Sequence, residues 1–286
     1  MNWRHLNGSF KFTQSSQPLL MGILNMTPDS FSDGNSYPTA QLALDHVSRM
    51  IDEGADLVDV GGESTRPGAK PVSTQEEIKR TQVIIQKIHQ KHPKTPISID
   101  TTKATVASSA IDAGASIIND ISAARWDPAM TELLASTQAG YICMHALDKP
   151  QKMQHDPHYQ NVPSQILEFL SSRQKELISL TIDPERLVFD VGIGFGKTVS
   201  HNLELLRRQD CWRQLKRPML WGLSRKSFIG KVLQTSVENR LAGSLAAHAY
   251  LLEHKQGPQI WRVHEIAEYK HLIKMWDALR LISFHG

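Results

Sequence analysis

Polar residues that could bind a small ligand stand at the ends of short apolar runs. Asp100, Asn119 and Asp190 each follow apolar residues, in the segments ISID, IIND and VFD. A carboxylate that starts beside a hydrophobic core is costly unless it is paired or accepts strong hydrogen bonds. Asparagine adds a donor and an acceptor, so the three side chains could together read the edge of a planar heterocycle. The alternative is that nearby Arg or Lys residues pair with the two acids for structural reasons.

Basic residues at three further positions predict contacts with anions. The segment SRKS (224–227) stands where a strand gives way to a helix, and a helix N-terminus close to a lysine favours an anion. Arg262 and His264 are two residues apart on a predicted strand, so their side chains share a face. Arg66 follows Thr65 in a predicted loop. A solvated surface is the alternative for each of these residues, and it has most weight for Arg66.

The glycine-rich segment GIGFGKT (192–198) matches neither of the common nucleotide-binding patterns. A phosphate-binding loop would need glycine where Val191 stands, and the dinucleotide pattern would need glycine where Lys197 stands. We expect the glycines to let the backbone pass close to a flat ligand, because glycine has no Cβ. Phe195 would then stack on that ligand, with ordinary packing inside the loop as the alternative.

Composition excludes several classes of protein. The chain has 286 residues, 40% of them hydrophobic and 21% charged, and its net charge is +3. So small a surplus argues against a broad nucleic-acid surface, and the lack of any apolar run of about 18 residues predicts no membrane span. Two cysteines are too few for a disulfide framework or a four-thiolate zinc site. The first apolar run, residues 19–24, is too short for a signal-peptide core, so we expect a cytoplasmic protein.

No motif for a catalytic triad or a zinc site stands out. The sequence contains no HExxH segment and no Cys-X-X-Cys pair. His145, His155 and His158 lie near one another in the sequence but lack the helical spacing of metal ligands. We therefore interpret this group of histidines as part of a solvated loop.

Short apolar runs alternate with helical segments along most of the chain. Eight runs are predicted strands: 19–25, 56–62, 96–101, 116–120, 141–145, 187–192, 219–224 and 260–264. The spacing of apolar residues predicts helices at 40–53, 74–91, 104–113, 129–138, 162–180, 238–253 and 266–281. Such alternation indicates an α/β fold with a parallel sheet, and eight units match a single (β/α)8 TIM barrel of roughly 250 residues. An open, doubly wound sheet is the alternative.

The barrel would place all of these strand ends at one mouth. We expect one domain over residues 1–286, with the barrel over 19–286 and a hairpin-like extension over 1–18 that closes the barrel bottom. Long loops at 26–39, 62–74 and 146–161 follow three of the strands and are rich in turn-forming residues. They lie on the C-terminal side of the strands, which is the face where barrels build active sites.

Seven segments closely resemble the signature segments of the dihydropteroate synthase family, in the family's order. They are MGILNMTPDSFSDG (21–34), DLVDVGGESTRPGA (56–69), SIDT (98–101), INDIS (118–122), DVGIGFGKT (190–198), GLSRKSFIG (222–230) and RVH (262–264). The resemblance implies a pterin-binding TIM barrel of folate biosynthesis. Such a transferase joins a dihydropterin pyrophosphate to p-aminobenzoate and releases pyrophosphate. Val191 and Glu265 depart from the family, which usually has Pro and Asp at these positions.

The resemblance also implies roles for individual residues. The pterin would be held by Asp100, Asn119, Ile121, Met144, Asp190, Phe195, Lys226 and Arg262. The p-aminobenzoate pocket would be formed by Phe31, Thr65, Arg66, Pro67, Phe195, Lys226 and Ser227. The pyrophosphate would lie against Asn25, Arg66, Arg262 and His264, with Asn25 also contacting the metal. The catalytic positions so implied are Asn25, Asp33, Arg66, Lys226, Arg262 and His264.

The implied cofactor is Mg²⁺, and the implied partners are the two small-molecule substrates and a second copy in a homodimer. Magnesium often takes only one or two protein ligands, which agrees with the lack of a conspicuous metal-binding motif. Inhibition by sulfonamides, which imitate p-aminobenzoate, is expected as well. One alternative is a paralogue that binds pterin without turnover. The other is a methyltransferase from methyltetrahydrofolate to a corrinoid protein, which has no need for the segments GGESTRPG, SRKSF and RVH.

Overall fold

The computed structural model describes residues 1–13, 15–27, 39–66 and 68–281. Eight parallel strands close into a barrel in the order β10-β3-β4-β5-β6-β7-β8-β9. The strands are β3 Leu19–Asn25, β4 Leu57–Gly61, β5 Ile97–Asp100, β6 Ile117–Asp120, β7 Gly140–Met144, β8 Leu187–Asp190, β9 Met219–Trp221 and β10 Gln259–Val263. Each predicted strand is present, so the predicted (β/α)8 barrel is confirmed and the open sheet is not.

The barrel closes because its last strand pairs with its first. Ile260 to Val263 of β10 stand opposite Leu19 to Gly22 of β3 in parallel register. Nearly every residue of the eight strands is buried, as expected for strands covered by helices on the outside and by one another inside. The continuous apolar character of the strand sequences is therefore explained by burial on both faces.

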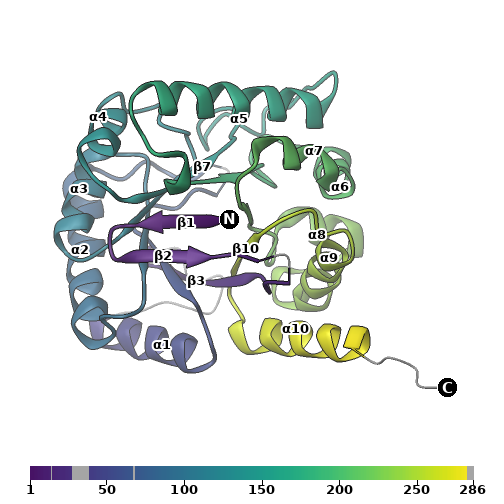
Figure 1. The fold of residues 1–286 in the computed structure, drawn as a ribbon, viewed down its shortest axis with the longest axis horizontal. Coiled ribbons are helices and arrows are strands. Elements are labelled where there is room, and N and C mark those ends of the chain that lie inside the picture. Colours follow the sequence, from purple (N-terminus) through teal and green to yellow (C-terminus); the bar gives the residue numbers. More distant parts are fainter. Residues whose placement is uncertain (14, 28–38, 67, 282–286) are drawn as a thin grey trace.

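Helices surround the barrel and form its outer layer (Figure 1). They are α1 Ala40–Asp52, α2 Thr74–Lys91, α3 Ala104–Asp112, α4 Ala129–Ser136, α5 Val162–Ser179, α6 Val199–Arg207, α7 Gln209–Trp212, α8 Ser227–Leu233, α9 Leu241–Glu253 and α10 Ile266–Leu281. Within the described residues, no helix is both long enough and apolar enough to cross a membrane.

Most helices match the predicted segments, and the differences have local causes. The segment predicted to start a helix at residue 238 instead opens with a 3₁₀ turn, η4 Val237–Asn239, and α9 begins at Leu241. The pattern had predicted no helix for α6 or α7. α6 depends on its start, where the Thr198 hydroxyl accepts a hydrogen bond from His201 N and the His201 ring accepts one from Thr198 N. Such reciprocal capping stabilises a short helix that periodicity alone does not reveal.

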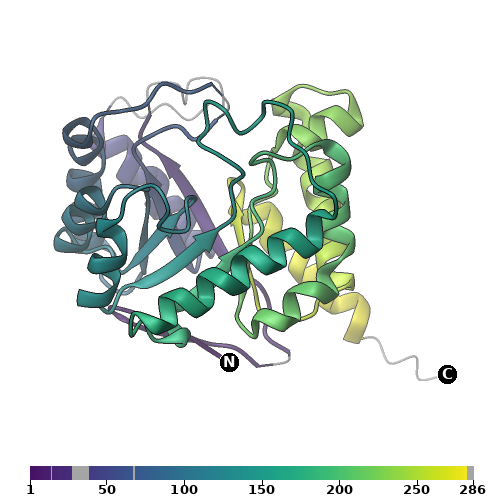
Figure 2. The same cartoon turned by 90° about the horizontal axis from the view of Figure 1, so that it is seen from above.

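The first residues form the predicted hairpin at the end of the barrel opposite the described residues of the loops after β4 and β7. β1 Asn2–His5 pairs antiparallel with β2 Gly8–Lys11. Figure 1 shows this hairpin across the ring of helices, and Figure 2 shows it below the barrel with the loops above. Trp3 is fully buried and donates from Nε1 to Arg186 O at 3.1 Å. Its ring packs with the lowest layer of barrel side chains, so the hairpin closes the barrel bottom.

Candidate active site

A cavity of about 540 Å³ opens at the C-terminal ends of the barrel strands. Its walls contain the predicted residues Asn25, Thr65, Arg66, Asp100, Phe195, Lys226, Ser227, Arg262 and His264. These residues come from six strands or the loops that follow them, namely β3, β4, β5, β8, β9 and β10, which confirms that these strand ends converge. Phe31, Asp33 and Pro67 lie outside the described residues.

The floor of the site is a pair of carboxylates joined by one guanidinium. Arg262 on β10 donates from Nε to Asp59 Oδ2 at 2.6 Å and from Nη2 to Asp100 Oδ2 at 2.9 Å. Asn119 on β6 donates from Nδ2 to the same Asp59 oxygen at 3.0 Å. Four strands thus contribute one polar residue each to a single network inside the barrel. The alternative interpretation of Asp100, that an arginine or lysine pairs with it, is correct, because Arg262 does so. Arg262 also lines the cavity, so the pair is part of the site as well.

Burial and charge oppose one another in this network. Burial raises the pKa of Asp100, and the positive charge of Arg262 opposes that rise. Burial disfavours the charged Arg262 side chain, but Asp59 and Asp100 more than compensate and raise its pKa. A guanidinium can serve two carboxylates because its N–H groups form a fixed fork. We conclude that Arg262 is charged and holds both acids in place.

Asp59 is the central acid, and sequence reasoning missed it. Its side chain is fully buried, and Oδ1 has no hydrogen-bond partner in the described structure. The only signal is an acidic residue in the middle of the apolar run DLVDVGG, where a buried strand otherwise carries aliphatic residues. An acid in such a position needs a partner, but the sequence does not say which residue supplies it.

Asp190 and Lys226 form a second charged region beside the floor. Asp190 Oδ1 accepts a hydrogen bond from Gly192 N at 2.7 Å. Burial raises the pKa of Asp190 to about 6, against the lowering effects of this hydrogen bond and of Lys226. Burial likewise lowers the pKa of Lys226 to about 8, and Asp190 opposes that change. Both groups therefore titrate within two units of neutrality.

An aromatic ring and its apolar backing lie next to Lys226. The Lys226 ammonium stands 4.2 Å from the centre of the Phe195 ring, a cation–π contact. Phe195 packs in a small cluster with Ile121, Met144 and Met153. Asn119, Ile121, Met144 and Asp190 are buried residues that do not belong to the cavity wall. Asn119 and Asp190 keep 5% and 6% of their surface exposed, so a ligand could reach them only at the deep end of the site.

The glycines around Phe195 are required by the backbone. Gly192, Gly194 and Gly196 have φ values of +70°, +84° and +68°. A Cβ on Gly192 would lie 1.8 Å from His145 O, and one on Gly196 would lie 2.3 Å from a side-chain carbon of Leu147. These contacts are with protein, so the predicted passage of this backbone close to a flat ligand stays a prediction. The group that it passes is the loop after β7, since Tyr159 also donates from its hydroxyl to Gly196 O at 3.0 Å.

His145 is buried, so its assignment to a solvated loop is wrong. His155 and His158 are exposed, as predicted. The ring nitrogen Nδ1 of His145 lies 3.1 Å from Lys197 Nζ, which also donates to Phe195 O at 3.0 Å. Burial lowers the pKa of Lys197 to about 7 and that of His145 to about 2. This pair joins the end of β7 to the glycine-rich loop, and His145 is buried because the 146–161 loop folds over it.

His264 is held by the loop that follows β9. Ser224 Oγ lies 2.9 Å from His264 Nδ1, which leaves Nε2 as the ring nitrogen open to a ligand. Glu265 receives the Ser224 hydroxyl at 3.4 Å and forms an ion pair with Arg225. Burial and the nearby cations lower the pKa of His264 to about 3, so the ring is neutral at pH 7. Glu265, which departs from the family pattern, thus holds the β9 loop together.

Asn25 is the predicted metal contact, and its surroundings fit a magnesium ion held by few protein atoms. It ends β3 and lines the cavity, and its Oδ1 lies 3.5 Å from the place a Cβ on Gly61 would take. Within the described residues there is no group of three or more His, Cys, Asp or Glu residues placed to hold a metal. A single amide oxygen fits a Mg²⁺ ion whose other ligands are phosphate oxygens and water, because the cations that line the cavity would hold the phosphate and the phosphate would hold the metal.

Residues 21–264 match the family model of the pterin-binding enzymes, a span that includes every strand end described above except β1 and β2. The chain belongs to this family. A dihydropteroate synthase of Haemophilus influenzae is 41% identical over 263 residues, which cover 92% of this chain and 94% of that protein. Membership of the pterin-binding enzymes and of their dihydropteroate synthases therefore extends over nearly the whole chain.

Solved structures of dihydropteroate synthases share the fold. The Yersinia pestis enzyme with a sulfonamide drug has a TM-score of 0.91 and 37% identity, over 98% of this chain and 99% of that one. The Xanthomonas albilineans enzyme with 4-aminobenzoic acid has a TM-score of 0.85 and 38% identity, over 93% and 94%. This pterin-binding family member is therefore an enzyme, a transferase with dihydropteroate synthase activity in folate synthesis.

Proposed function

We propose that the cavity at the strand ends catalyses the displacement of pyrophosphate from a dihydropterin by p-aminobenzoate, with Mg²⁺ assistance. The observation that carries the proposal is the charge arrangement of the cavity. Its floor holds the Asp59–Arg262–Asp100 network, and its walls add the cations Arg66 and Lys226 beside the neutral His264 ring. Acids that are buried and hydrogen-bonded suit the N–H groups of a pterin, while cations at the wall suit a pyrophosphate.

The pterin ring is assigned to the floor. Asp100, Asn119 and Asp190 offer oxygens to N–H groups of the ring, and Asn119 also offers an N–H. Phe195 lines the cavity and the Lys226 ammonium lies over its ring, which supports a flat binding place beside these two residues. The cavity volume of about 540 Å³ falls within the usual range for small-molecule sites, roughly 300–1,000 Å³.

The pyrophosphate is assigned to Asn25, Arg66, Arg262 and His264. When bound, Mg²⁺ would supply charge neutralisation for the departing pyrophosphate, with Asn25 as its protein ligand. Arg66 and Arg262 would stabilise the same developing charge. Neutral His264 is oriented by Ser224, and it can donate a hydrogen bond from Nε2 in the tautomer in which the Ser224 hydroxyl donates to Nδ1 in place of Glu265. The hard part of the reaction is departure of the pyrophosphate, and these groups act on it directly.

The aromatic amine needs no activated nucleophile in the protein. An aromatic amine is mostly uncharged at pH 7 and attacks through its own lone pair. Thr65, Arg66 and Ser227 line the cavity and are assigned to p-aminobenzoate, whose carboxylate matches a cation. We favour a dissociative displacement: the bond from the exocyclic methylene carbon to oxygen breaks, and the new carbon–nitrogen bond forms as the amine loses a proton to solvent.

The decisive experiment supplies dihydropterin pyrophosphate, p-aminobenzoate and Mg²⁺ to the purified chain. The proposal predicts dihydropteroate, detected by chromatography, together with pyrophosphate. Tight pterin binding without product would contradict it and favour the paralogue that binds without turnover. Methyl transfer from methyltetrahydrofolate to a corrinoid protein would favour the methyltransferase.

The chain is also proposed to act as a homodimer in the cytoplasm. Large apolar side chains are exposed on the adjacent helices α8, α9 and α10, among them Val232, Tyr250, Met275 and Leu279. A second copy of the chain would cover them, because large apolar side chains exposed on neighbouring helices favour an interface. Sedimentation equilibrium tests this: a mass of twice 32.1 kDa supports the dimer, and a monomer at micromolar concentration contradicts it.

A further inference from the structure

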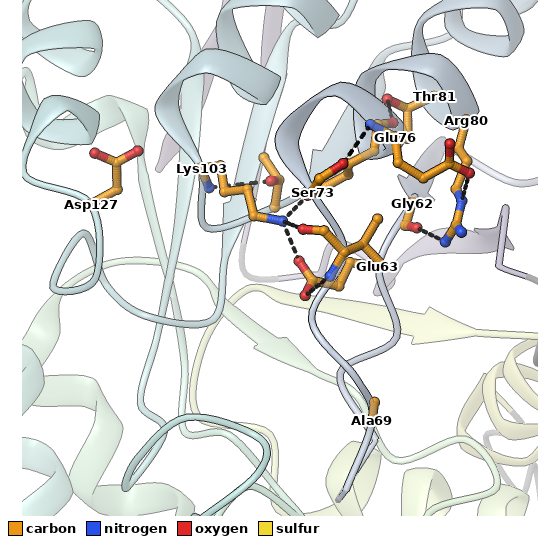
Figure 3. A network of polar contacts seen from close by, with 12 residues as sticks. Gly62, Glu63, Ala69, Ser73, Glu76, Arg80, Thr81, Lys103 and Asp127 are labelled. Atoms are coloured by element: carbon orange, nitrogen blue, oxygen red, sulfur yellow. Dashed lines mark hydrogen bonds and ion pairs between the residues drawn. The ribbon is translucent and has the colours of Figure 1, made fainter.

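The loop between β4 and α2 is tied at its base by one lysine. Lys103 Nζ, at the start of α3, donates to Glu63 Oε2 at 2.6 Å and to Val72 O at 2.7 Å. It also donates to Glu77 Oε2 on α2 at 2.6 Å. Figure 3 shows Glu63 and Lys103 close together at the base of the loop, with Ala69 well away from them. One ammonium thus reaches the first part of the loop, its last part and the helix that follows.

Glu63 joins the two ends of the loop a second time. Its Oε1 accepts a hydrogen bond from Val72 N at 3.0 Å, while its Oε2 accepts from Lys103. Just before it, Gly62 O accepts from Arg80 Nη1 at 3.0 Å, which fastens the loop entrance to α2. The nine-residue separation of Glu63 and Val72 is therefore closed by side-chain contacts rather than by a backbone ladder. We call Glu63, Val72, Glu77 and Lys103 the loop clamp.

The side chains of the clamp are largely buried, so the attraction between its charges is screened less by water. The Glu77 side chain is only 1% exposed, and those of Lys103 and Glu63 are 25% and 22% exposed. Burial raises the pKa of Glu77, against the effect of Lys103. All three donor positions of the Lys103 ammonium are used by named acceptors, so its direction is fixed.

The first part of the clamped loop faces the cavity. Glu63, Ser64, Thr65 and Arg66 line it in succession, whereas Val72, Glu77 and Lys103 do not. We infer that Glu63 and Lys103 are positioning residues for the second substrate: by closing the base of the loop they hold Thr65 and Arg66 where p-aminobenzoate binds. This inference rests on the proposed function. Lys103 lies outside the cavity and acts through the loop, while Glu63 lines the cavity with its two carboxylate oxygens already held by Val72 N and Lys103 Nζ.

Holding a loop in its binding conformation raises affinity, because less ordering remains to be done when the ligand arrives. Releasing the clamp should therefore weaken the binding of p-aminobenzoate. It should not affect the binding of the pterin, which is assigned to the floor of the cavity. A residue with a purely structural role would instead lower the melting temperature and leave both Michaelis constants unchanged in the folded protein.

The test compares Glu63→Ala with a matched control, Asp127→Ala. Glu63→Ala removes both contacts across the loop base but leaves Lys103 paired with Glu77. Asp127 Oδ2 accepts from Ala104 N at 2.8 Å, so its loss weakens the start of the same helix without touching the loop. We expect Glu63→Ala to raise KM for p-aminobenzoate about tenfold and to change KM for the pterin pyrophosphate less than twofold. Asp127→Ala should leave both constants within twofold.

Two further variants refine the test. Glu63→Gln keeps an acceptor for Val72 N and should restore KM part of the way. Lys103→Met removes the shared donor and should resemble or exceed Glu63→Ala, although it leaves the buried Glu77 carboxylate without a cation. An unchanged KM for p-aminobenzoate in Glu63→Ala overturns the inference, as does an equal rise in Asp127→Ala.

Hydrogen exchange of the loop amides tests the clamp independently of enzyme activity. In Glu63→Ala, amides of residues 64–66 and 68–70 should exchange at least about fivefold faster than in the unmodified chain, since opening the loop exposes them. Unchanged exchange overturns the clamp, whatever the activity. If the unmodified chain forms no dihydropteroate, the proposed function fails, and faster exchange in the variant still establishes that Glu63 holds the loop.

Discussion

Arg262 Nε lies 2.6 Å from Asp59 Oδ2, and this ion pair crosses the inside of the barrel between strands that are not neighbours. β10 and β4 are separated by β3, so the contact joins the last strand to the second. The same guanidinium reaches Asp100 on the next strand over. The floor of the cavity is thus fixed by side chains as well as by the backbone ladder, and its acids are held ready for a ligand.

Removal of Asp59 should therefore cost stability. Asp59→Ala leaves Asn119 without its acceptor and Arg262 with one carboxylate in place of two. Breaking a buried ion pair by removing one partner typically costs about 3–5 kcal/mol. We expect a loss of that size in the free energy of unfolding measured by urea denaturation.

Ser98→Ala is the matched control for Asp59→Ala. Ser98 stands opposite Asp59 in the β4–β5 register, and its buried Oγ has no hydrogen-bond partner in the described residues. Removing an unsatisfied hydroxyl should change stability by less than about 1 kcal/mol. Equal losses in the two variants would contradict the importance of the Asp59–Arg262 pair.

Asp190 should contribute mainly to the transition state. Asp190→Ala removes a buried carboxylate that is assigned to the pterin. Charge-assisted hydrogen bonds of this kind are worth about 2–4 kcal/mol, which corresponds to a loss of roughly 30- to 1000-fold in kcat/KM. Steady-state rates at varied pterin pyrophosphate measure it, with circular dichroism to establish that the variant is folded. A change within twofold in a folded variant would remove Asp190 from the site.

The rate should fall in acid because of the same residue. Burial raises the pKa of Asp190 to about 6, so the carboxylate that accepts from the pterin is lost as the pH drops through that value. Below it, kcat/KM for the pterin pyrophosphate should decline about tenfold per pH unit. Profiles between pH 5 and pH 8 test this. Asp190→Asn should be slower throughout and lack the acid decline, and an unchanged decline would assign it to another group.

Magnesium should be required for turnover and not for recognition of the pterin ring. Chelation by EDTA should abolish product formation, and added Mg²⁺ should restore it. Asn25→Ala should raise the Mg²⁺ concentration for half-maximal rate roughly tenfold or more, since it removes a metal contact. Calorimetry measures whether binding also needs the metal: the affinity of the protein for a pterin that lacks phosphates should be the same with and without Mg²⁺. An undiminished rate in EDTA would contradict a requirement for Mg²⁺ in turnover.

Much of the fold could be predicted from the sequence because buried positions carry apolar residues, and their spacing differs between strands and helices. All eight strands are apolar runs followed by polar residues, and the helices that cover them show helical spacing. α7, which is four residues long, and α6 were missed because a short helix leaves little periodicity and depends on its cap. The hairpin at the barrel bottom was expected, and Trp3 explains why it stays there.

The candidate site could be predicted in part, for equally physical reasons. Side chains at strand ends, such as Asp100 and Arg262, can be recognised in the sequence because they are polar residues at the end of an apolar run. Asp59 lies within a strand, and its partner is about 200 residues away, so only the closed barrel reveals the pair. His145 and Lys103 depend on loops that fold over them or meet them, and no local pattern encodes such contacts.

The most direct test of the account is one reaction followed for two products. The purified chain is mixed with dihydropterin pyrophosphate, p-aminobenzoate and Mg²⁺ in water enriched in ¹⁸O, and both products are quantified at several times. The account predicts one dihydropteroate for each pyrophosphate, with no ¹⁸O in the pyrophosphate, because the carbon–oxygen bond breaks and the amine takes the carbon. Release of pyrophosphate without dihydropteroate, or no release at all, would contradict it.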